Sequence, residues 1–287
     1  MSPPASAVRR RFFRLLAGAV LLAAAAACDP ESAGPPPPPV VETAPRAPAP
    51  EPAPPPVPSG GGSFRVAYAP PRGAALAGWE RFAHDTRFLE RTAADLNGWL
   101  VLPAPVTLSF SGCGEANAFY DGPTRRVVMC YELLDALGQV FADRATPEER
   151  ERAILGAAGF LLYHELGHAL IDVLDLPALG REEDSADQFA AYVLVDGTGD
   201  GERAALDGVV ALGRLDAEFD DLAYADEHSL GVQRFYNVAC WVYGRDPAAH
   251  ARFLERGTLP AERAERCPAE YAALERSWDR LLEPYAR

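Results

Sequence analysis

HELGH, residues 164–168, is the most informative segment of this 287-residue sequence. It lies in the last third of an apolar segment that begins with TPEE, residues 146–149, a helix-capping box with proline at the first helical position. The sequence predicts one long helix from there to about Asp175. On such a helix His164 and His168 stand one turn apart on the same face.

Two imidazoles at this spacing can bind one metal ion, and Glu165 between them can act as general base towards a metal-bound water. A hydrolytic zinc site needs a third protein ligand. The next predicted helix, about 181–195, offers Glu183 as that ligand, and Asp187 on the same face as hydrogen-bond acceptor for a ligand histidine. The alternative is a buried helix with two satisfied histidines, followed by a solvated acidic turn. For Glu182 we expect that solvated position.

A β section is expected before the long helix. Residues 106–110 alternate apolar with polar, and residues 118–120 and 126–129 flank Asp121-Gly122, a dipeptide that favours a tight hairpin turn. These segments predict a small antiparallel sheet. Residues 76–100 have helical spacing of apolar positions and predict one helix that packs on the core.

The N-terminus predicts export. In residues 1–27, a cluster of arginines precedes an apolar run of about 13 residues, whereas a stable membrane-spanning helix takes about 20. Cys28 follows directly and resembles the lipidated cysteine of bacterial lipoproteins; ordinary cleavage with an incidental cysteine is the alternative. We therefore expect a lipid-anchored protein of the cell envelope that faces the periplasm or the cell exterior.

Cysteine usage agrees with an oxidising compartment. Setting Cys28 aside from the five cysteines leaves four, an even number. Cys113 with Cys130, and Cys240 with Cys267, pair each cysteine with its neighbour in the sequence. Four cysteines allow two other connectivities, which the sequence leaves open.

Composition and charge set the domain limits and the class of partner. Residues 28–63 are dominated by proline and alanine, cannot bury a core, and suit a tether; a tail without a spacing role is the alternative. A single globular domain is expected over residues 64–287. The formal net charge of -14 repels phosphate backbones, so nucleic acid is not an expected partner.

The motifs resemble those of the gluzincin metallopeptidases. In that family the two histidines of HExxH and a glutamate of an ExxxD segment bind zinc, which matches HELGH followed by EDSAD at residues 183–187. HALID (168–172) and NAFYDG (117–122) are similar to the zinc helix and the edge strand of the thermolysin branch. This likeness covers roughly residues 111–241, and the domain as a whole resembles a poorly characterised bacterial metallopeptidase family. A long calcium-rich N-terminal β domain, as in thermolysin, is absent from the sequence.

The resemblance implies a zincin-like α+β fold, with a small sheet, a mostly helical remainder and the HExxH helix at a cleft. It implies that Asn117 and Ala118 on the edge strand hold the substrate backbone. An oxyanion also needs a hydrogen-bond donor beyond zinc. His228, which precedes another predicted helix, is in a position similar to the downstream histidine of the thermolysin group, and Tyr236 is the runner-up.

The function expected from these features is zinc-dependent hydrolysis of peptide bonds in a peptide or protein. One alternative is a zinc-containing scaffold or binding lipoprotein without turnover. Another is a zinc amidase that acts on a cell-wall amide. Glu165 favours an enzyme, because a purely structural zinc site has no need of a base.

Overall fold

One long helix, α4 (Pro147–Val173), runs through the centre of the computed structural model, which describes residues 61–215 and 229–287. Thr146 caps it: the backbone N–H of Glu149 donates to the Thr146 hydroxyl at 3.2 Å, as the sequence predicts. Among the described residues α4 alone is long and apolar enough to cross a membrane, but 78% of its apolar window is buried inside the fold. That burial is typical of a core helix.

The sheet has four strands in the order β1-β2-β4-β3: β1 (Phe64–Tyr68), β2 (Val106–Ser111), β4 (Arg126–Cys130) and β3 (Ala118–Asp121). β1, β2 and β4 run parallel, and only β3 is antiparallel, to β4. The prediction of an antiparallel sheet is therefore wrong for three of the strands. Alternation of apolar and polar residues marks a strand but carries no information about the direction of its neighbour.

The hairpin between β3 and β4 exists, but its turn is longer than predicted. Residues Gly122–Thr124 form a 3-10 turn, which Arg125 ends in the left-handed conformation at φ 48°. A two-residue turn at Asp121-Gly122 would require the backbone N–H of residue 123 to close the loop. Pro123 has no N–H, so the chain takes a wider path.

The segment before β2 forms two helices where one is expected. α1 (Ala77–Thr86) and α2 (Phe88–Trp99) are separated by Arg87, whose φ is 50°. They connect β1 to the parallel strand β2, which is the long crossover that parallel pairing requires. α2 packs against β1 and β2, while α4 packs against β3 and β4.

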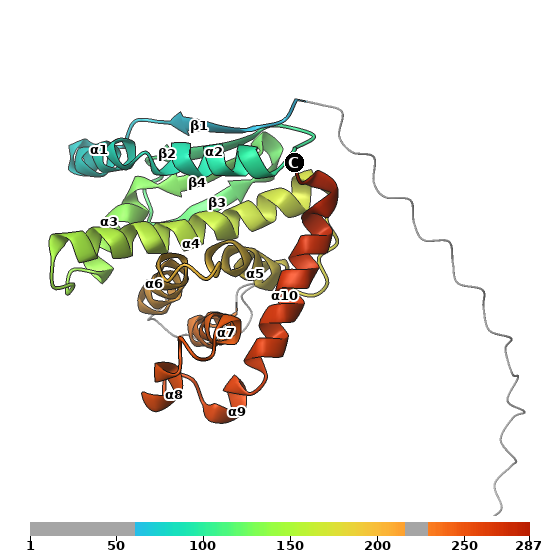
Figure 1. Cartoon of the computed structure of the whole chain (residues 1–287). Helices are drawn as coiled ribbons and strands as arrows, with labels where there is room; N and C mark the ends of the chain where they lie inside the picture. The colour runs from blue at the N-terminus through green and yellow to red at the C-terminus, as the bar shows by residue number, and fades with distance from the viewer. Residues whose placement is uncertain (1–60, 216–228) are drawn as a thin grey trace, which may run out of the picture. The chain divides into compact units, whose positions relative to one another are not determined.

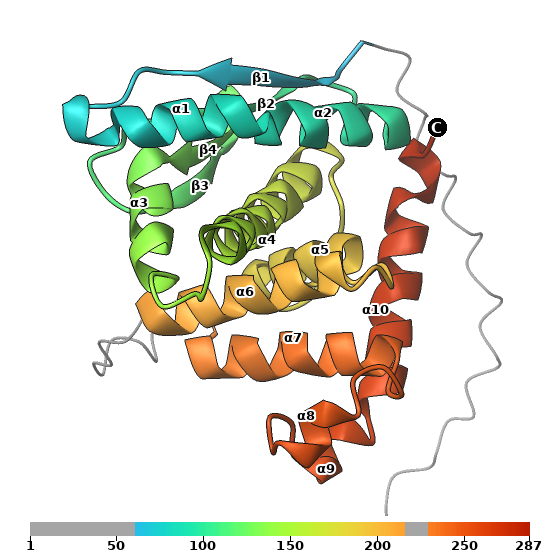
Figure 2. The ribbon, with the colours of Figure 1, turned by 60° about the vertical axis from the view of Figure 1, so that its left-hand side comes forward.

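The rest of the chain is helical, in agreement with the predicted α+β class. α5 and α6 pack on α4, α7 packs on α6, and α10 contacts both α5 and α7 (Figures 1 and 2). The bounds are α3 Tyr131–Val140, α5 Glu182–Leu194, α6 Asp200–Leu215, α7 Gly231–Arg245, α8 Arg252–Glu255, α9 Ala261–Ala264 and α10 Cys267–Leu282.

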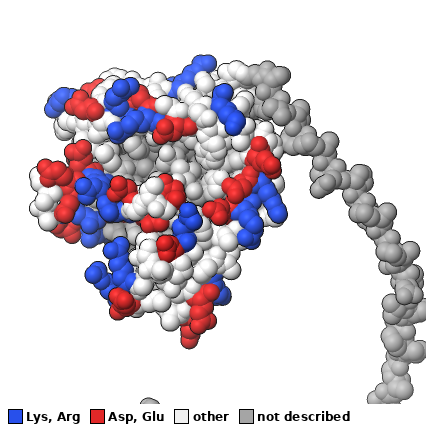
Figure 3. All heavy atoms as spheres, viewed as in Figure 1, with Lys and Arg blue, Asp and Glu red and all other residues white. Residues whose placement is uncertain are grey.

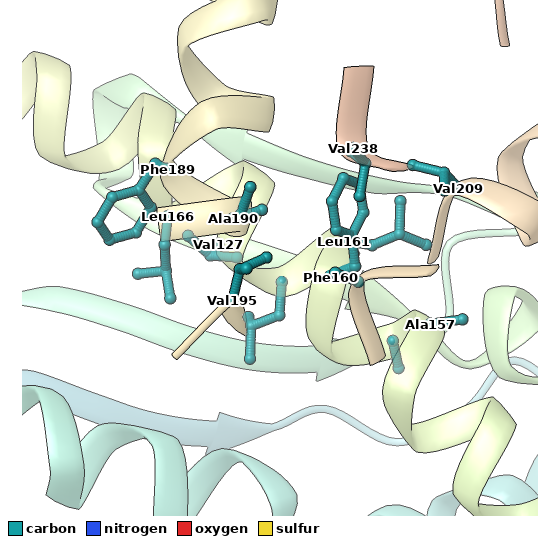
Figure 4. Close-up of a cluster of buried hydrophobic side chains, with 14 of the residues drawn as sticks. Val127, Ala157, Phe160, Leu161, Leu166, Phe189, Ala190, Val195, Val209 and Val238 are labelled. Atoms are coloured by element: carbon teal, nitrogen blue, oxygen red, sulfur yellow. The ribbon is translucent and has the colours of Figure 1, made fainter. Parts of the chain in front are cut away.

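A single apolar core joins the sheet to these helices. Figure 4 shows Val127 of β4, Leu166 of α4, Phe189 of α5, Val209 of α6 and Val238 of α7 in one cluster. All five are fully buried. Because α4 contributes to this cluster from several turns, its position is fixed on the sheet side and on the side of α5 and α6.

Both expected disulfides are present. Cys113–Cys130 joins the segment after β2 to the end of β4, with sulfur atoms 2.03 Å apart, and Cys240–Cys267 joins α7 to α10. The two other connectivities are thereby excluded. Cys28 and the predicted signal segment lie outside the described residues.

On the face seen in Figure 3, arginines and acidic residues are interspersed.

Candidate metal centre

The close approach of α5 to α4 creates the site. Gly167 lies where a Cβ atom would come within 2.8 Å of the Ala186 Cα and 3.2 Å of its Cβ. The absence of a side chain at Gly167 and the small side chain at Ala186 therefore let the two helices cross closely. This crossing brings Glu183, one turn before Ala186 on α5, against the histidines of α4.

The three residues predicted as metal ligands converge. The Nε2 atom of His164 lies 3.1 Å from Oε2 of Glu183, and Nε2 of His168 lies 3.4 Å from its Oε1. Potential ligand atoms of all three residues lie within 4.8 Å of one another. Two imidazoles and one carboxylate are a donor set used by catalytic zinc, so the residues fit the ion that the sequence predicts.

A second group with metal-binding side chains, Cys113, Cys130 and Glu132, lies beside β4. Its two sulfur atoms are bonded to each other, so neither is a thiolate that could bind a metal. The Glu132 carboxylate instead accepts hydrogen bonds from the backbone N–H groups of Cys113, at 3.1 Å, and Gly114, at 2.7 Å. These contacts anchor the chain just before β3.

Asp187 contacts the Nδ1 atom of His164, the nitrogen on the side of the ring away from Glu183. The Nδ1 atom of His164 lies 2.9 Å from Asp187 Oδ1, and both side chains are buried. Burial lowers the pKa of His164, but hydrogen bonds to Asp187 and Glu183 outweigh it, so that the pKa is raised above its ordinary value. When the ring is neutral and the N–H is at Nδ1, the lone pair is on Nε2.

Arg234 of α7 also contacts Asp187, and this contact was not predicted from the sequence. Its Nε donates to Asp187 Oδ2 at 2.8 Å and its Nη2 donates to Oδ1 at 2.6 Å. Burial raises the pKa of Asp187, but His164 and Arg234 together hold it below its ordinary value. A pattern of apolar spacing on α7 could place Arg234 on a buried face, but no sequence pattern joins it to Asp187, 47 residues away.

Glu182 contacts the other histidine. Its Oε1 lies 2.7 Å from Nδ1 of His168, although its side chain is 50% exposed. The expectation that Glu182 has only solvent around it is therefore wrong. Burial lowers the pKa of His168, but hydrogen bonds to Glu183 and Glu182 outweigh it and raise the pKa to about 9.

Glu165, the predicted base, is buried beside both histidines, with 8% of its surface exposed. Burial raises its pKa; His164, His168 and the backbone N–H of Tyr120 act in the opposite direction, and the net effect is a raised pKa. A carboxylate with a raised pKa is a stronger base than an ordinary one, and this environment suits proton transfer near neutral pH.

The side of the edge strand β3 that does not pair with β4 faces Glu165. The backbone N–H of Cys130 donates to the Asn117 carbonyl at 3.0 Å, so in this antiparallel pair the main-chain groups of Ala118 and Tyr120 point away from β4. The Asn117 side chain accepts a hydrogen bond from the Ala118 N–H at 2.9 Å. The substrate-holding role of these residues stays a prediction, and the exposed edge is the feature that such a role requires.

Tyr120 fastens this strand to α4. Its hydroxyl donates to Asp172 Oδ2 at 2.6 Å, one helical turn after His168. Burial, followed by the hydrogen bond to Asp172, raises the pKa of Tyr120, so the hydroxyl stays protonated and remains a donor. The distance between the histidines and the edge strand is thereby held by a side-chain contact.

The two candidate oxyanion donors differ in what the structure says of them. His228 lies outside the described residues. Tyr236 is on α7, two residues after Arg234 and therefore about 200° further round the helix. Because Arg234 faces Asp187, Tyr236 points away from Asp187. The residue is 37% exposed, and its ring packs against Phe235.

Comparison with known proteins identifies a family for this chain. Searches of the curated proteins and of the solved structures give no match. The model of the domain family DUF4344, described as "Putative metallopeptidase", matches residues 68–282, which include α4, α5 and the edge strand. A match over this much of the chain shows that the chain belongs to this metallopeptidase family.

Proposed function

We propose that this protein is a zinc-dependent endopeptidase. The observation that carries the proposal is the convergence of His164, His168 and Glu183 beside the buried carboxylate of Glu165. The donor set of two imidazoles and a carboxylate favours zinc among the common metals of hydrolases, and three protein ligands leave a position for water. A zinc ion bound there would lower the pKa of that water and polarise the scissile carbonyl.

Glu165 is the proposed general base. The hydrogen bond from the Tyr120 N–H and the two histidines fix its carboxylate next to the ligands, and burial keeps bulk water from competing for it. It accepts the proton of the attacking water and returns it to the leaving amine. His228 remains the proposed donor to the oxyanion.

An extended peptide is the proposed substrate. The main-chain carbonyls of Ala118 and Tyr120 point away from β4 and can accept hydrogen bonds from a peptide that lies alongside the strand, while the N–H groups of the two residues donate to Asn117 and Glu165. Asn117, at the start of the strand, adds a side-chain amide to this edge. The pairing needs consecutive main-chain amides, which favours a peptide over a substrate with a single isolated amide, such as a cell-wall crosslink.

We further propose that the domain acts outside the cytoplasm, tethered through a lipid on Cys28. The arginine cluster and apolar run before Cys28, the proline-rich residues 28–63 and the two disulfides support this. Labelling of cells with a fatty-acid probe, with Cys28→Ser as comparison, tests it. Equal labelling of both proteins, or none in either, would exclude the lipid anchor.

Metal analysis and a peptide assay test the proposed activity. We expect one zinc per chain, cleavage of a mixed peptide library that a chelator abolishes, and a loss of about 100-fold or more in kcat for Glu165→Gln with zinc retained. Glu151→Gln, a change of the same kind at an exposed position of α4, is the matched control and should keep full activity. Absence of zinc, or full activity of Glu165→Gln, would overturn the proposal. Zinc binding without cleavage would favour the non-catalytic scaffold.

A further inference from the structure

We propose that Glu182 is a positioning residue for His168: its carboxylate holds the Nδ1–H group so that Nε2 faces the metal. The inference rests on the metal site of the proposed function and deepens it. Glu182 lies 2.7 Å from Nδ1 of His168, within the range of a charge-assisted hydrogen bond.

The His168 ring has a carboxylate at each nitrogen. Glu182 faces Nδ1, and the next residue, Glu183, lies 3.4 Å from Nε2. Consecutive helical residues point about 100° apart, so two adjacent glutamates can reach opposite sides of one imidazole. A ring that donates from Nδ1 to Glu182 is fixed in one tautomer and one orientation, with the Nε2 lone pair directed at Glu183 and the proposed ion.

This contact parallels the one that Asp187 makes to His164. In both cases a carboxylate of α5 holds Nδ1 of a histidine of α4, at 2.9 Å for Asp187 and 2.7 Å for Glu182. The first turns of α5 therefore supply an orienting carboxylate to each histidine and a shared ligand, Glu183, between them. The two rings stand at 79° to each other, and both Nε2 atoms face the same carboxylate.

The two orienting carboxylates differ in burial and charge balance, which makes the role of Glu182 testable. Asp187 is buried and accepts hydrogen bonds from Arg234, so its removal would also take a carboxylate from a buried arginine. Glu182 is half exposed, and within the part of the chain that the structure describes no arginine pairs with it. Its replacement should therefore change the histidine more than it changes folding.

A solvated acidic residue that only favours the helix N-terminus is the competing explanation. Asp184 belongs to the same first turn of α5, but its carboxylate accepts a hydrogen bond from the Ser229 hydroxyl at 2.8 Å, and contacts neither histidine. Asp184→Ala removes the same charge from the same helix end. It is therefore the matched control for Glu182→Ala.

The experiment measures zinc affinity of the full-length protein by competition with a chromophoric chelator, together with the melting temperature of the metal-free protein. We expect a 10- to 100-fold weaker zinc affinity for Glu182→Ala, as for loss of other residues that orient a metal-bound histidine. Glu182→Gln, whose amide oxygen can still accept from Nδ1–H, should recover part of it. Asp184→Ala should stay close to wild type in zinc affinity, and metal-free Glu182→Ala should still unfold in one cooperative transition.

Equal zinc affinity of Glu182→Ala and wild type would overturn the inference. So would an equal loss in Asp184→Ala, because the effect would then come from charge at the helix end. If Glu182→Ala does not fold, Glu182→Gln takes its place in the comparison. A zinc affinity weaker than that of both wild type and Asp184→Ala then supports the inference, and an affinity equal to that of wild type overturns it. Wild-type protein that binds zinc without cleaving peptides would refute the peptidase proposal and leave this comparison valid, whereas wild-type protein that binds no zinc would overturn both.

Discussion

Arg234 donates two hydrogen bonds to Asp187, from Nε at 2.8 Å and from Nη2 at 2.6 Å, and the same carboxylate lies 2.9 Å from Nδ1 of His164. A residue of α7 is thus joined through α5 to a proposed ligand on α4. All three side chains are buried. The geometry of the proposed metal centre therefore depends on the packing of three helices that are distant in sequence.

Replacement of Arg234 by methionine should destabilise the protein by about 3–5 kcal/mol, because it removes one partner of a buried ion pair from the Asp187 carboxylate. Urea unfolding of the metal-free protein measures this. Arg203→Met removes an arginine from an exposed pair with Asp200, at 3.2 Å, and should cost less than about 1 kcal/mol. An equal loss of unfolding free energy in the two variants would show that the buried Arg234–Asp187 pair stabilises the fold no more than an exposed pair does.

The disulfide Cys113–Cys130 should affect substrate binding as well as stability. Cys130 also pairs with Asn117 through its backbone N–H, so the disulfide holds the start of the edge strand. Its removal by a double change to alanine should cost about 3 kcal/mol, as expected for a closed loop of this size, and should raise KM more than it lowers kcat.

The second disulfide provides the control for that prediction. Cys240–Cys267 joins α7 to α10 and involves no residue of β3 or of the segment before it. The double alanine variant at these positions should lose a similar amount of stability in urea and keep its KM. A KM that rises equally in both variants would indicate a general loosening of the fold.

The parts of this structure that were predicted from the sequence depend on local interactions. The start of α4 follows from a hydrogen bond between residues three apart, Thr146 and Glu149. The convergence of His164, His168 and Glu183 followed from helical spacing and from the chemical need of two histidines for a third ligand. Both kinds of information are contained in short stretches of the chain.

The parts that were missed depend on contacts between distant segments. The direction of β2 relative to β4 is set by the path of the chain, because parallel and antiparallel strands have the same side-chain alternation. Arg234 meets Asp187 across 47 residues, and Glu182 meets His168 across 14. The prediction of a single helix over residues 76–100 is wrong at Arg87, where the chain takes a positive φ. Arginine has no preference for this conformation, so the sequence does not indicate the break.

The metal-free protein should lose stability as pH rises above about 6.5. The folded-state pKa of His168 is about 9, above the unfolded value of about 6.5, because of Glu183 and Glu182. The contribution of the protonated ring is therefore fully present below pH 6.5 and is lost as pH rises through 9. His164, whose pKa is also raised, acts with the same sign.

Urea unfolding of metal-free protein at several pH values across this window measures the slope. His168→Gln should reduce the slope and leave the part that comes from His164, since glutamine does not titrate. Saturation with zinc should reverse the trend, because the metal competes with protons for the same nitrogens and binds more tightly as they deprotonate. A metal-free protein whose stability rises from pH 6.5 to 9 would contradict the prediction.

Two glycines of α4 allow the effect of close packing on stability to be measured apart from the effect of helix propensity. A Cβ at Gly167 would meet the backbone of α5 at 2.8 Å, whereas a Cβ at Gly159 would meet only a ring atom of Phe88, at the ordinary distance of 3.9 Å. Alanine at either position gains about 1 kcal/mol of helix propensity. At Gly167 overpacking should destabilise the fold by about 1–3 kcal/mol, which opposes this gain, because the Ala186 backbone cannot move without shifting α5.

We therefore expect Gly159→Ala to stabilise the protein by up to about 1 kcal/mol and to leave zinc affinity unchanged. Gly167→Ala should lose up to about 2 kcal/mol and bind zinc more weakly, because any shift of α5 moves Glu183 away from His164 and His168. Urea unfolding and chelator competition measure the two effects. If Gly167→Ala loses stability but keeps wild-type zinc affinity, zinc binding does not depend on the close crossing of α4 and α5. That result would contradict the prediction.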